Sequence, residues 1–141
     1  MIQKEIKVYG TILLSSENKI LLVCGRRSGK WSFPKGHPNK NESHDSCARR
    51  ETHEETGILI SDTFDEHLRL STGKYFIHKL NGQPEGVPLD KNEVVDIGWW
   101  TIHQIQRLNV NIDVSYFLKY HRNYLWTINN NNEYIPNVIQ T

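Results

Sequence analysis

Cysteine is scarce in this chain of 141 residues, and long apolar runs and an excess of one charge are missing. Its two cysteines, Cys24 and Cys47, cannot build a disulfide framework, so we expect both to be reduced and no disulfide-linked partner. No apolar run is long enough to span a bilayer, and the charged residues 1–7 are unlike a signal peptide. We therefore expect a cytoplasmic, intracellular protein without a membrane partner.

Opposite charges nearly balance in the sequence. The 17 Lys and Arg residues face 16 Asp and Glu residues, which gives a formal net charge of +1. This balance provides no global field that would attract nucleic acid, so any such binding has to come from local patches.

Apolar alternation and turn signals predict a single α/β domain over residues 1–128, followed by a polar tail at 129–141 that we expect to be mobile. We expect strands at 6–14, 19–24, 58–60, 75–80 and 94–101, a loop at 81–88, and helices at 43–56, 102–108 and 113–126. The last helix carries an aromatic stripe that we expect to pack on the sheet; its members are Tyr116, Phe117, Tyr120 and Tyr124.

Residues 36–58 carry the clearest chemical pattern, G-x5-E-x7-R-E-T-x-E-E-x-G-I. Ser43 can cap a helix that runs without Gly or Pro to Gly57, which predicts about four helical turns. At about 100° per residue, the side chains of Glu51, Glu54 and Glu55 share one face of this helix. Two such carboxylates held about 5 Å apart repel by about 3 kcal/mol at an effective dielectric near 20, and a divalent cation would turn that cost into binding.

The ligand chemistry favours a hard ion. Carboxylate oxygens without nearby Cys or paired His indicate one or more Mg²⁺ ions, with Mn²⁺ as the alternative, rather than Zn²⁺. His44 and His53 are nine positions apart and do not form a zinc pair.

The segment at 31–38 is rich in Pro and Gly, and it must bend back over the helix to bring Gly36 near the carboxylates. A glycine lets its backbone approach a ligand or a metal closely. Lys35 and a basic run are candidates to face the anionic groups of a substrate; the run consists of Arg26, Arg27 and Lys30. The chemistry implied is attack of water on a phosphorus centre, with cations screening the phosphate charge.

On these residues, the stretch at 36–58 resembles a complete Nudix box, the signature of hydrolases that cleave a nucleoside diphosphate linked to another group. The resemblance implies an α/β/α sandwich with a mixed sheet, the box helix on one side and a C-terminal helix on another. The metal ligands that it implies are Glu51, Glu54, Glu55 and the Gly36 carbonyl.

Two further positions follow from the same resemblance. Arg50 would brace the box against a carboxylate such as Glu42. Thr52 stands where an aliphatic residue is usual in the family, at a position that faces the packing side.

The flanks of the box resemble the catalytic domain of the eukaryotic mRNA decapping enzyme. The similar segments are V-Y-G-T-I-L-L at 8–14, K-I-L-L-V-C-G at 19–25, W-S-F-P-K-G at 31–36, C-A-R-R-E at 47–51 and N-E-V-V-D-I-G-W-W at 92–100. This resemblance implies that Glu93, just ahead of the late strand, is a candidate general base. It also implies a C-terminal helix at 112–128 that helps bind RNA, and capped RNA as the substrate.

Together these residues predict metal-dependent hydrolysis of a phosphoanhydride in a nucleotide or a capped RNA. The general base is Glu93 or a box glutamate, Glu51 or Glu54, while Lys35 and Arg27 stabilise charge on the leaving phosphate. Two alternatives stay open. One is a hydrolase of small diphosphates, such as dinucleoside polyphosphates, diphosphoinositol polyphosphates or damaged nucleoside triphosphates. The other is a non-catalytic Nudix module that senses a nucleotide. The oligomeric state is also left open.

Overall fold

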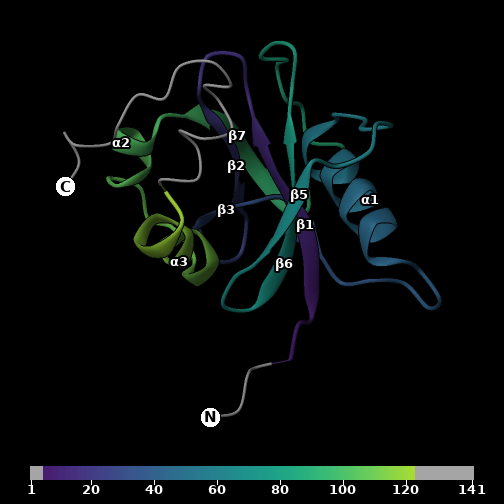
Figure 1. Cartoon of the computed structure of the whole chain (residues 1–141). Helices are drawn as coiled ribbons and strands as arrows, with labels where there is room; N and C mark the ends of the chain where they lie inside the picture. Colours follow the sequence, from purple (N-terminus) through teal and green to yellow (C-terminus); the bar gives the residue numbers. More distant parts are fainter. Residues whose placement is uncertain (1–4, 123–141) are drawn as a thin grey trace.

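Residues 5–122 are described by the structure, a computed structural model, and they form a mixed β-sheet between two layers of helices (Figure 1). The strands are β1 (Val8–Leu14), β2 (Ile20–Gly25), β3 (Trp31–Ser32), β4 (Lys35–Gly36), β5 (Glu66–Arg69), β6 (Gly73–Lys79) and β7 (Val94–Trp100). The helices are α1 (His44–Thr56), α2 (Ile102–Ile105) and α3 (Ile112–Tyr120). None of the helices within 5–122 has the length and apolar character needed to cross a membrane.

Two long pairings hold the sheet together. β1 runs parallel to β6 along all seven residues of both strands, and β2 runs antiparallel to β7. β1 and β2 themselves pair only next to their connecting turn, through Leu14 and Ile20, and then separate. β5 adds to the far side of β6, which gives the order β3-β2-β1-β6-β5.

The segment at 31–36 fills the space that opens between β1 and β2. β3 pairs with the end of β2, and β4 pairs with the beginning of β1. Between them, the Thr11 N–H donates to the Pro34 carbonyl oxygen at 3.1 Å. The Pro and Gly content of this segment favours irregular backbone, and that prediction is wrong at 31–32 and 35–36, where two short strands fix the segment. Their pairing holds Gly36 in the sheet beside α1.

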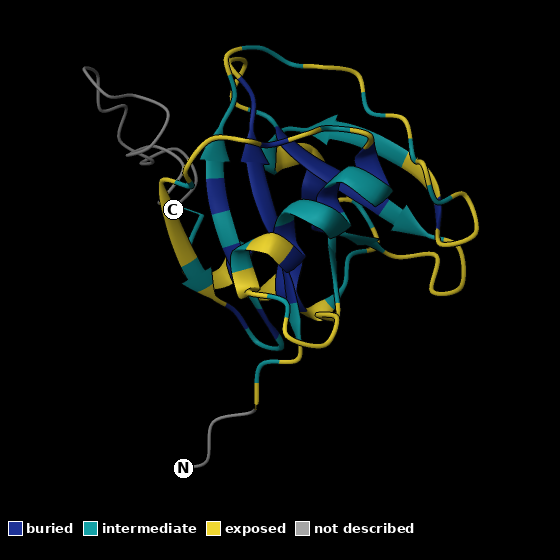
Figure 2. Cartoon of the chain, turned by 90° about the vertical axis from the view of Figure 1, so that its right-hand side faces the viewer, coloured by how far each residue is buried: buried dark blue, intermediate teal, exposed yellow. Residues whose placement is uncertain are grey.

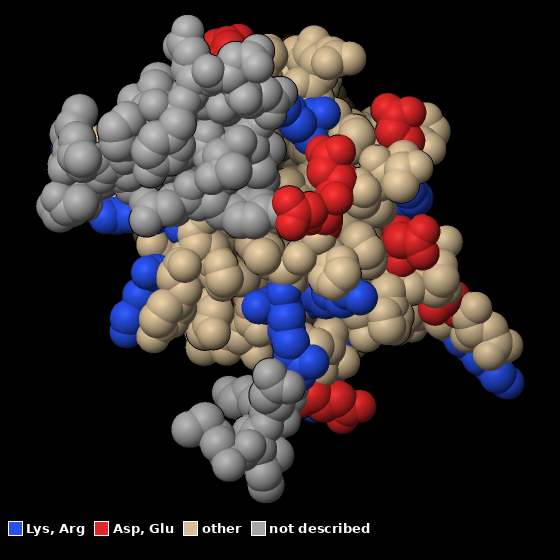
Figure 3. Space-filling view, in the orientation of Figure 1, with Lys and Arg blue, Asp and Glu red and all other residues tan. Residues whose placement is uncertain are grey.

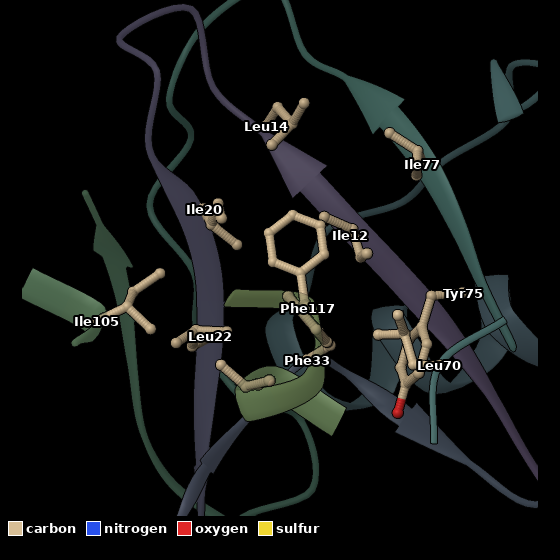
Figure 4. Packing of buried hydrophobic residues seen from close by; sticks show 11 residues of the cluster. Ile12, Leu14, Ile20, Leu22, Phe33, Leu70, Tyr75, Ile77, Ile105 and Phe117 are labelled. Carbon is tan, nitrogen blue, oxygen red and sulfur yellow. The ribbon is translucent and has the colours of Figure 1, made fainter. Parts of the chain in front are cut away.

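The two faces of β1 bury different clusters. Leu13 points toward the face that α1 covers, where it packs with Leu21 and Ile60. Its neighbours point to the opposite face, into the main cluster of Ile12, Leu14, Ile20, Leu22, Phe33, Leu70, Tyr75, Ile77, Ile105, Val114 and Phe117 (Figure 4). Viewed from the α1 side, the buried residues are concentrated in the strands behind this helix (Figure 2). The α/β/α sandwich expected from the sequence is confirmed.

Local signals set both ends of α1. The Ser43 side chain accepts a hydrogen bond from the Ser46 N–H at the first turn. At the other end Gly57 adopts a left-handed conformation with φ of 75°, and its N–H donates to the His53 carbonyl at 2.8 Å. Both boundaries agree with the prediction from the sequence.

Other elements differ from the prediction. Residues 58–60 form no strand, whereas β5 lies where none was expected. α3 ends at Tyr120, before the boundary expected from the sequence. The expected helical residues 123–128 and the polar tail at 129–141 lie outside the described part of the chain.

The aromatic stripe on α3 divides between the core and the surface. Phe117 is 1% exposed and packs edge-on against Phe33. Tyr116 and Tyr120 are 38% and 59% exposed, so the expectation that the whole stripe packs on the sheet was wrong. Residues four apart on a helix share one face, and that face of α3 points away from the sheet.

Candidate active site

Gly36 and Glu51 meet where β4 lies against α1. Because a Cβ at position 36 would overlap the Glu51 carboxylate, only glycine leaves room for this approach. The thiol of Cys47, one turn earlier on α1, donates to the Gly36 carbonyl oxygen at 3.6 Å. Burial raises the pKa of this thiol to about 11, so it stays protonated and able to donate.

Arg50 ties the carboxylates of the stretch to one another. Its guanidinium donates to both carboxylate oxygens of Glu42, at 2.9 and 3.0 Å, and to the His37 carbonyl at 3.0 Å. Its Nη1 also donates to Glu51 at 3.1 Å and to Glu54 at 3.3 Å. The hydrogen bonds with Glu42 raise the pKa of Arg50 well above its usual range and lower the pKa of Glu42. The guanidinium is therefore a fixed positive charge among three carboxylates.

Glu55 is the most deeply buried of the three helix carboxylates, at 6% exposed. It accepts a hydrogen bond from the Lys35 backbone N–H at 3.2 Å. Burial raises the pKa of Glu55 to about 8, although the Lys35 N–H and the Lys35 charge oppose the change. Burial also raises the pKa of Glu51, with the Arg50 charge opposing it. A cation bound beside Glu51 and Glu55 would stabilise their ionised forms, which burial disfavours.

Glu93, directly before β7, lies near the same carboxylates. Its backbone is held by the Arg26 N–H, which donates to the Glu93 carbonyl at 2.8 Å. Its negative charge is near enough to contribute to the raised pKa of both Glu51 and Glu55. The structure thus brings together residues that are about 40 positions apart in the chain.

A cavity of about 240 Å³ lies beside these groups, and its walls include Lys30, Lys35, Glu55, Glu93 and Asn111. A larger hollow of about 670 Å³ lies beside the start of α1, lined in part by Phe64 and Phe76, and none of the three helix glutamates lines it. We place the candidate active site in the smaller cavity, because Glu55 of α1 lines it together with Glu93, Lys30 and Lys35.

The box pattern and this geometry agree with a comparison against known protein families. The NUDIX domain model matches residues 5–120. The chain belongs to the NUDIX domain family. It is therefore placed among the NUDIX hydrolases, which generally use a divalent metal ion such as Mg²⁺.

Named relatives fall within the same family. The m7GpppN-mRNA hydrolase of Saccharomyces cerevisiae is 33% identical over 124 residues, which is 82% of this chain and 13% of that protein. The mRNA-decapping enzyme subunit 2 of Arabidopsis thaliana is 30% identical over 109 residues, which is 72% of this chain and 29% of that protein. The NUDIX chain thus spans between about one eighth and one third of the length of these relatives.

Solved structures share the NUDIX fold. An Ap4A hydrolase of C. elegans, in a binary complex, has a TM-score of 0.71 at 23% identity, and the match covers 84% of this chain and 98% of that chain. At this identity, the likeness establishes the fold alone.

The basic residues expected to face the substrate do not act as one group in this NUDIX domain. Lys30 and Lys35 line the cavity with Glu55 and Glu93. The guanidinium of Arg26 instead donates to the Lys91 carbonyl, at 2.8 and 3.2 Å. Arg27 is exposed in the turn after β2, and it is not among the residues that line the cavity. Over the face in Figure 3, basic and acidic side chains are interspersed among neutral ones.

The donor set fits a hard divalent ion, since it consists of carboxylate oxygens and the Gly36 carbonyl. As the side chains stand, no three His, Cys, Asp or Glu side chains within 5–122 surround one point as ligands of an ion. The physical reason is that Arg50 bridges Glu51 and Glu54, while Glu55 accepts from the Lys35 N–H. A bound ion would compete with the guanidinium for these oxygens.

Asn111 is one of the residues that line the cavity without being marked by a sequence pattern as part of the site. An Asn directly before a helical pattern is a usual N-cap signal, and Asn111 is the N-cap of α3. That signal marks the start of a helix, but it does not reveal that the helix begins at the cavity.

Proposed function

We propose that this chain is a Mg²⁺-dependent hydrolase that cleaves a phosphoanhydride bond in the 5′ cap of RNA. The observation that carries the proposal is the mixed lining of the cavity, in which Glu55 and Glu93 occur together with Lys30 and Lys35. Carboxylates can hold cations, lysines can neutralise phosphate oxygens, and both are needed where phosphate charge builds up.

The metal would be held by Glu51, Glu54, Glu55 and the Gly36 carbonyl. A bound Mg²⁺ or Mn²⁺ supplies charge screening at the phosphates and lowers the pKa of a coordinated water. Glu93 or a box glutamate accepts the proton of the attacking water. As the new P–O bond forms, the bridging P–O bond breaks, and Lys35 stabilises the negative charge on the phosphate that leaves.

The choice of capped RNA rests on sequence similarity to the two relatives named for mRNA decapping and for m7GpppN-mRNA hydrolysis. Cleavage of a cap by this reaction would give methylated guanosine diphosphate and RNA with a 5′ monophosphate. Because this chain matches only a fraction of those proteins, the substrate has to be tested directly.

The first experiment tests catalysis with Glu54→Gln. The Glu54 side chain is 42% exposed and forms an ion pair with Arg50, so the fold should persist without its charge. We expect Mg²⁺-dependent turnover to fall by at least about 100-fold with an unchanged thermal melt. Glu17→Gln, in the exposed turn after β1, is the matched control and should keep full activity. Near-normal turnover by the Glu54→Gln protein would overturn the proposed catalytic role of the box.

The second experiment tests the substrate with a panel that contains capped RNA, free cap dinucleotide, dinucleoside polyphosphates and diphosphoinositol polyphosphates, each with Mg²⁺ and with Mn²⁺. Preference for capped RNA in kcat/KM would support the proposal. A higher kcat/KM for the small diphosphates would show that they, and not capped RNA, are the substrates. Binding of nucleotide without release of product would indicate a non-catalytic module.

A further inference from the structure

Asn111 lies in the wall of the catalytic cavity, and its side chain has two ends with different tasks. As the N-cap of α3, its Oδ1 accepts a hydrogen bond from the Val114 N–H at 3.0 Å. This bond fixes which end of the amide is the oxygen. The amide nitrogen Nδ2 therefore carries two N–H groups for which no acceptor is found among residues 5–122, at a cavity that also contains Lys30 and Lys35.

The position of Asn111 is fixed by β3. Its backbone N–H donates to the Trp31 carbonyl at 3.0 Å, and the Trp31 N–H donates to the Asn109 carbonyl at 2.8 Å. Val110 and Trp31 form a parallel bridge between these bonds. This bridge and the two backbone hydrogen bonds thus hold the residues before α3 along the edge of β3, and Figure 1 shows α3 beside β3.

The first turn of α3 is also held from its other side, by a buried carboxylate. Asp113 is fully buried and accepts hydrogen bonds from the Thr72 N–H and hydroxyl, both at 2.7 Å, and from the Tyr75 hydroxyl at 2.6 Å. Tyr75 is itself fully buried in the main cluster, where Figure 4 shows its hydroxyl at the lower edge. With anchors on both sides, the Asn111 amide cannot drift away from the cavity, which is the rigidity that a binding group needs.

From these observations we infer that Asn111 contacts the substrate, with Nδ2 donating a hydrogen bond to a phosphate oxygen. The inference rests on the proposed function and adds to it a neutral donor at the cavity that Lys30, Lys35, Glu55 and Glu93 also line. A phosphate oxygen is the group that fits, because a donor beside two cations is matched by an anionic acceptor. The same side chain caps α3, so Asn111 would both bind the phosphate and stabilise the start of this helix.

The test separates the two ends of the amide. Asn111→Ser and Asn111→Asp keep an oxygen that can cap α3, whereas Asn111→Ala removes both the cap and the donor. We expect the Ser and Asp variants to melt at the normal temperature and to lose about 10-fold to 100-fold in affinity for substrate, seen as a raised KM with a smaller change in kcat. The Ala variant should show a similar rise in KM and, in addition, a melting temperature that is lower by about 2–6 °C.

Binding of a nucleoside diphosphate, measured by calorimetry with Mg²⁺, gives a readout that does not depend on turnover. Weaker binding by the Ser and Asp variants would support the inference even where turnover is low. Normal KM and normal binding in both variants, with a loss confined to the melting temperature of the Ala variant, would reduce Asn111 to a helix cap and overturn it. If the wild-type protein turns over no compound of the panel but binds the diphosphate through Asn111, the proposed function fails and the inference stands. If the wild-type protein neither cleaves nor binds, both fail.

Discussion

The Cα of Gly36 faces the carboxylate of Glu51 with no room for a side-chain atom between them. This contact joins a two-residue strand to the middle of α1, and it places the Gly36 carbonyl and the Glu51 carboxylate on the same side of the helix. The Cys47 thiol adds a weak hydrogen bond to that carbonyl. Two oxygen groups that could bind a metal ion, one on β4 and one on α1, are therefore brought together by backbone packing.

Gly36→Ala is expected to separate these two donors. The added methyl group would overlap the Glu51 carboxylate, so Glu51 has to swing away and give up its bond to Arg50. We expect weaker Mg²⁺ binding in calorimetry, turnover reduced by at least about 100-fold, and a loss of about 1–3 kcal/mol in the free energy of unfolding. Gly82→Ala is the control, because a Cβ there meets no atom within 4 Å. Equal Mg²⁺ affinity in the two variants would contradict the proposed role of the Gly36–Glu51 contact.

Arg50→Lys is expected to lower the free energy of unfolding more in the metal-free protein than in the metal-bound protein. A lysine presents one ammonium group, which cannot donate to both oxygens of Glu42 and also bridge Glu51 and Glu54. In EDTA, urea unfolding should show a loss of about 1–3 kcal/mol, since carboxylates are left without their partner. Saturating Mg²⁺ should recover part of this loss, because the ion supplies positive charge to the same oxygens. An equal loss with and without Mg²⁺ would mean that ion and guanidinium do not compete.

The sequence predicts those parts of the fold that local interactions determine. Ser43 and Gly57 set the ends of α1, because capping bonds join residues that are close in the chain. β5 could not be predicted, since the polar segment Glu66–Arg69 is a strand only through its pairing with β6. The reverse holds for 58–60, which has the apolar pattern of a strand but pairs with none in the described sheet, and instead buries Ile60 beneath α1.

The candidate site divides in the same way. The helical spacing of Glu51, Glu54 and Glu55 places them on one side of α1 from sequence alone. By contrast, Arg26 and Lys30 are equivalent in a sequence pattern, and only the fold turns Lys30 to the cavity while Arg26 binds the Lys91 carbonyl. Long-range pairing decides such differences, and it cannot be read from spacing.

The raised pKa of Glu55 predicts that the metal-free protein loses stability as pH rises. Burial favours the protonated carboxyl, so the folded protein holds a proton up to a pH of about 8, whereas the unfolded chain releases it near 4.5. The folded state binds more protons between these values, so the free energy of unfolding falls across that window, by about 3–5 kcal/mol in total. Urea unfolding in EDTA at a series of pH values measures this slope, and Glu55→Gln should flatten it.

Mg²⁺ provides the control for this titration. A bound cation favours the ionised carboxylate, so the same series with Mg²⁺ should show a smaller fall in stability above pH 4.5. If the Glu55→Gln protein keeps the full slope in EDTA, the proton is held elsewhere, and the assignment to Glu55 is wrong.

Thr52 and Thr11 are both fully buried, and their hydroxyl oxygens lie 2.7 Å apart between α1 and β1. Since an aliphatic residue is usual at position 52, Thr52→Val appears conservative, yet it leaves the Thr11 hydroxyl without this partner. We expect a loss of about 1–3 kcal/mol in the free energy of unfolding for either single change to valine. The double change Thr11→Val with Thr52→Val removes donor and acceptor together, so its loss should be smaller than the sum of the two single losses. Urea unfolding of all four proteins completes the cycle. Strictly additive losses would show that the two hydroxyl groups do not depend on each other, and that the threonine in the box is not there to pair with Thr11.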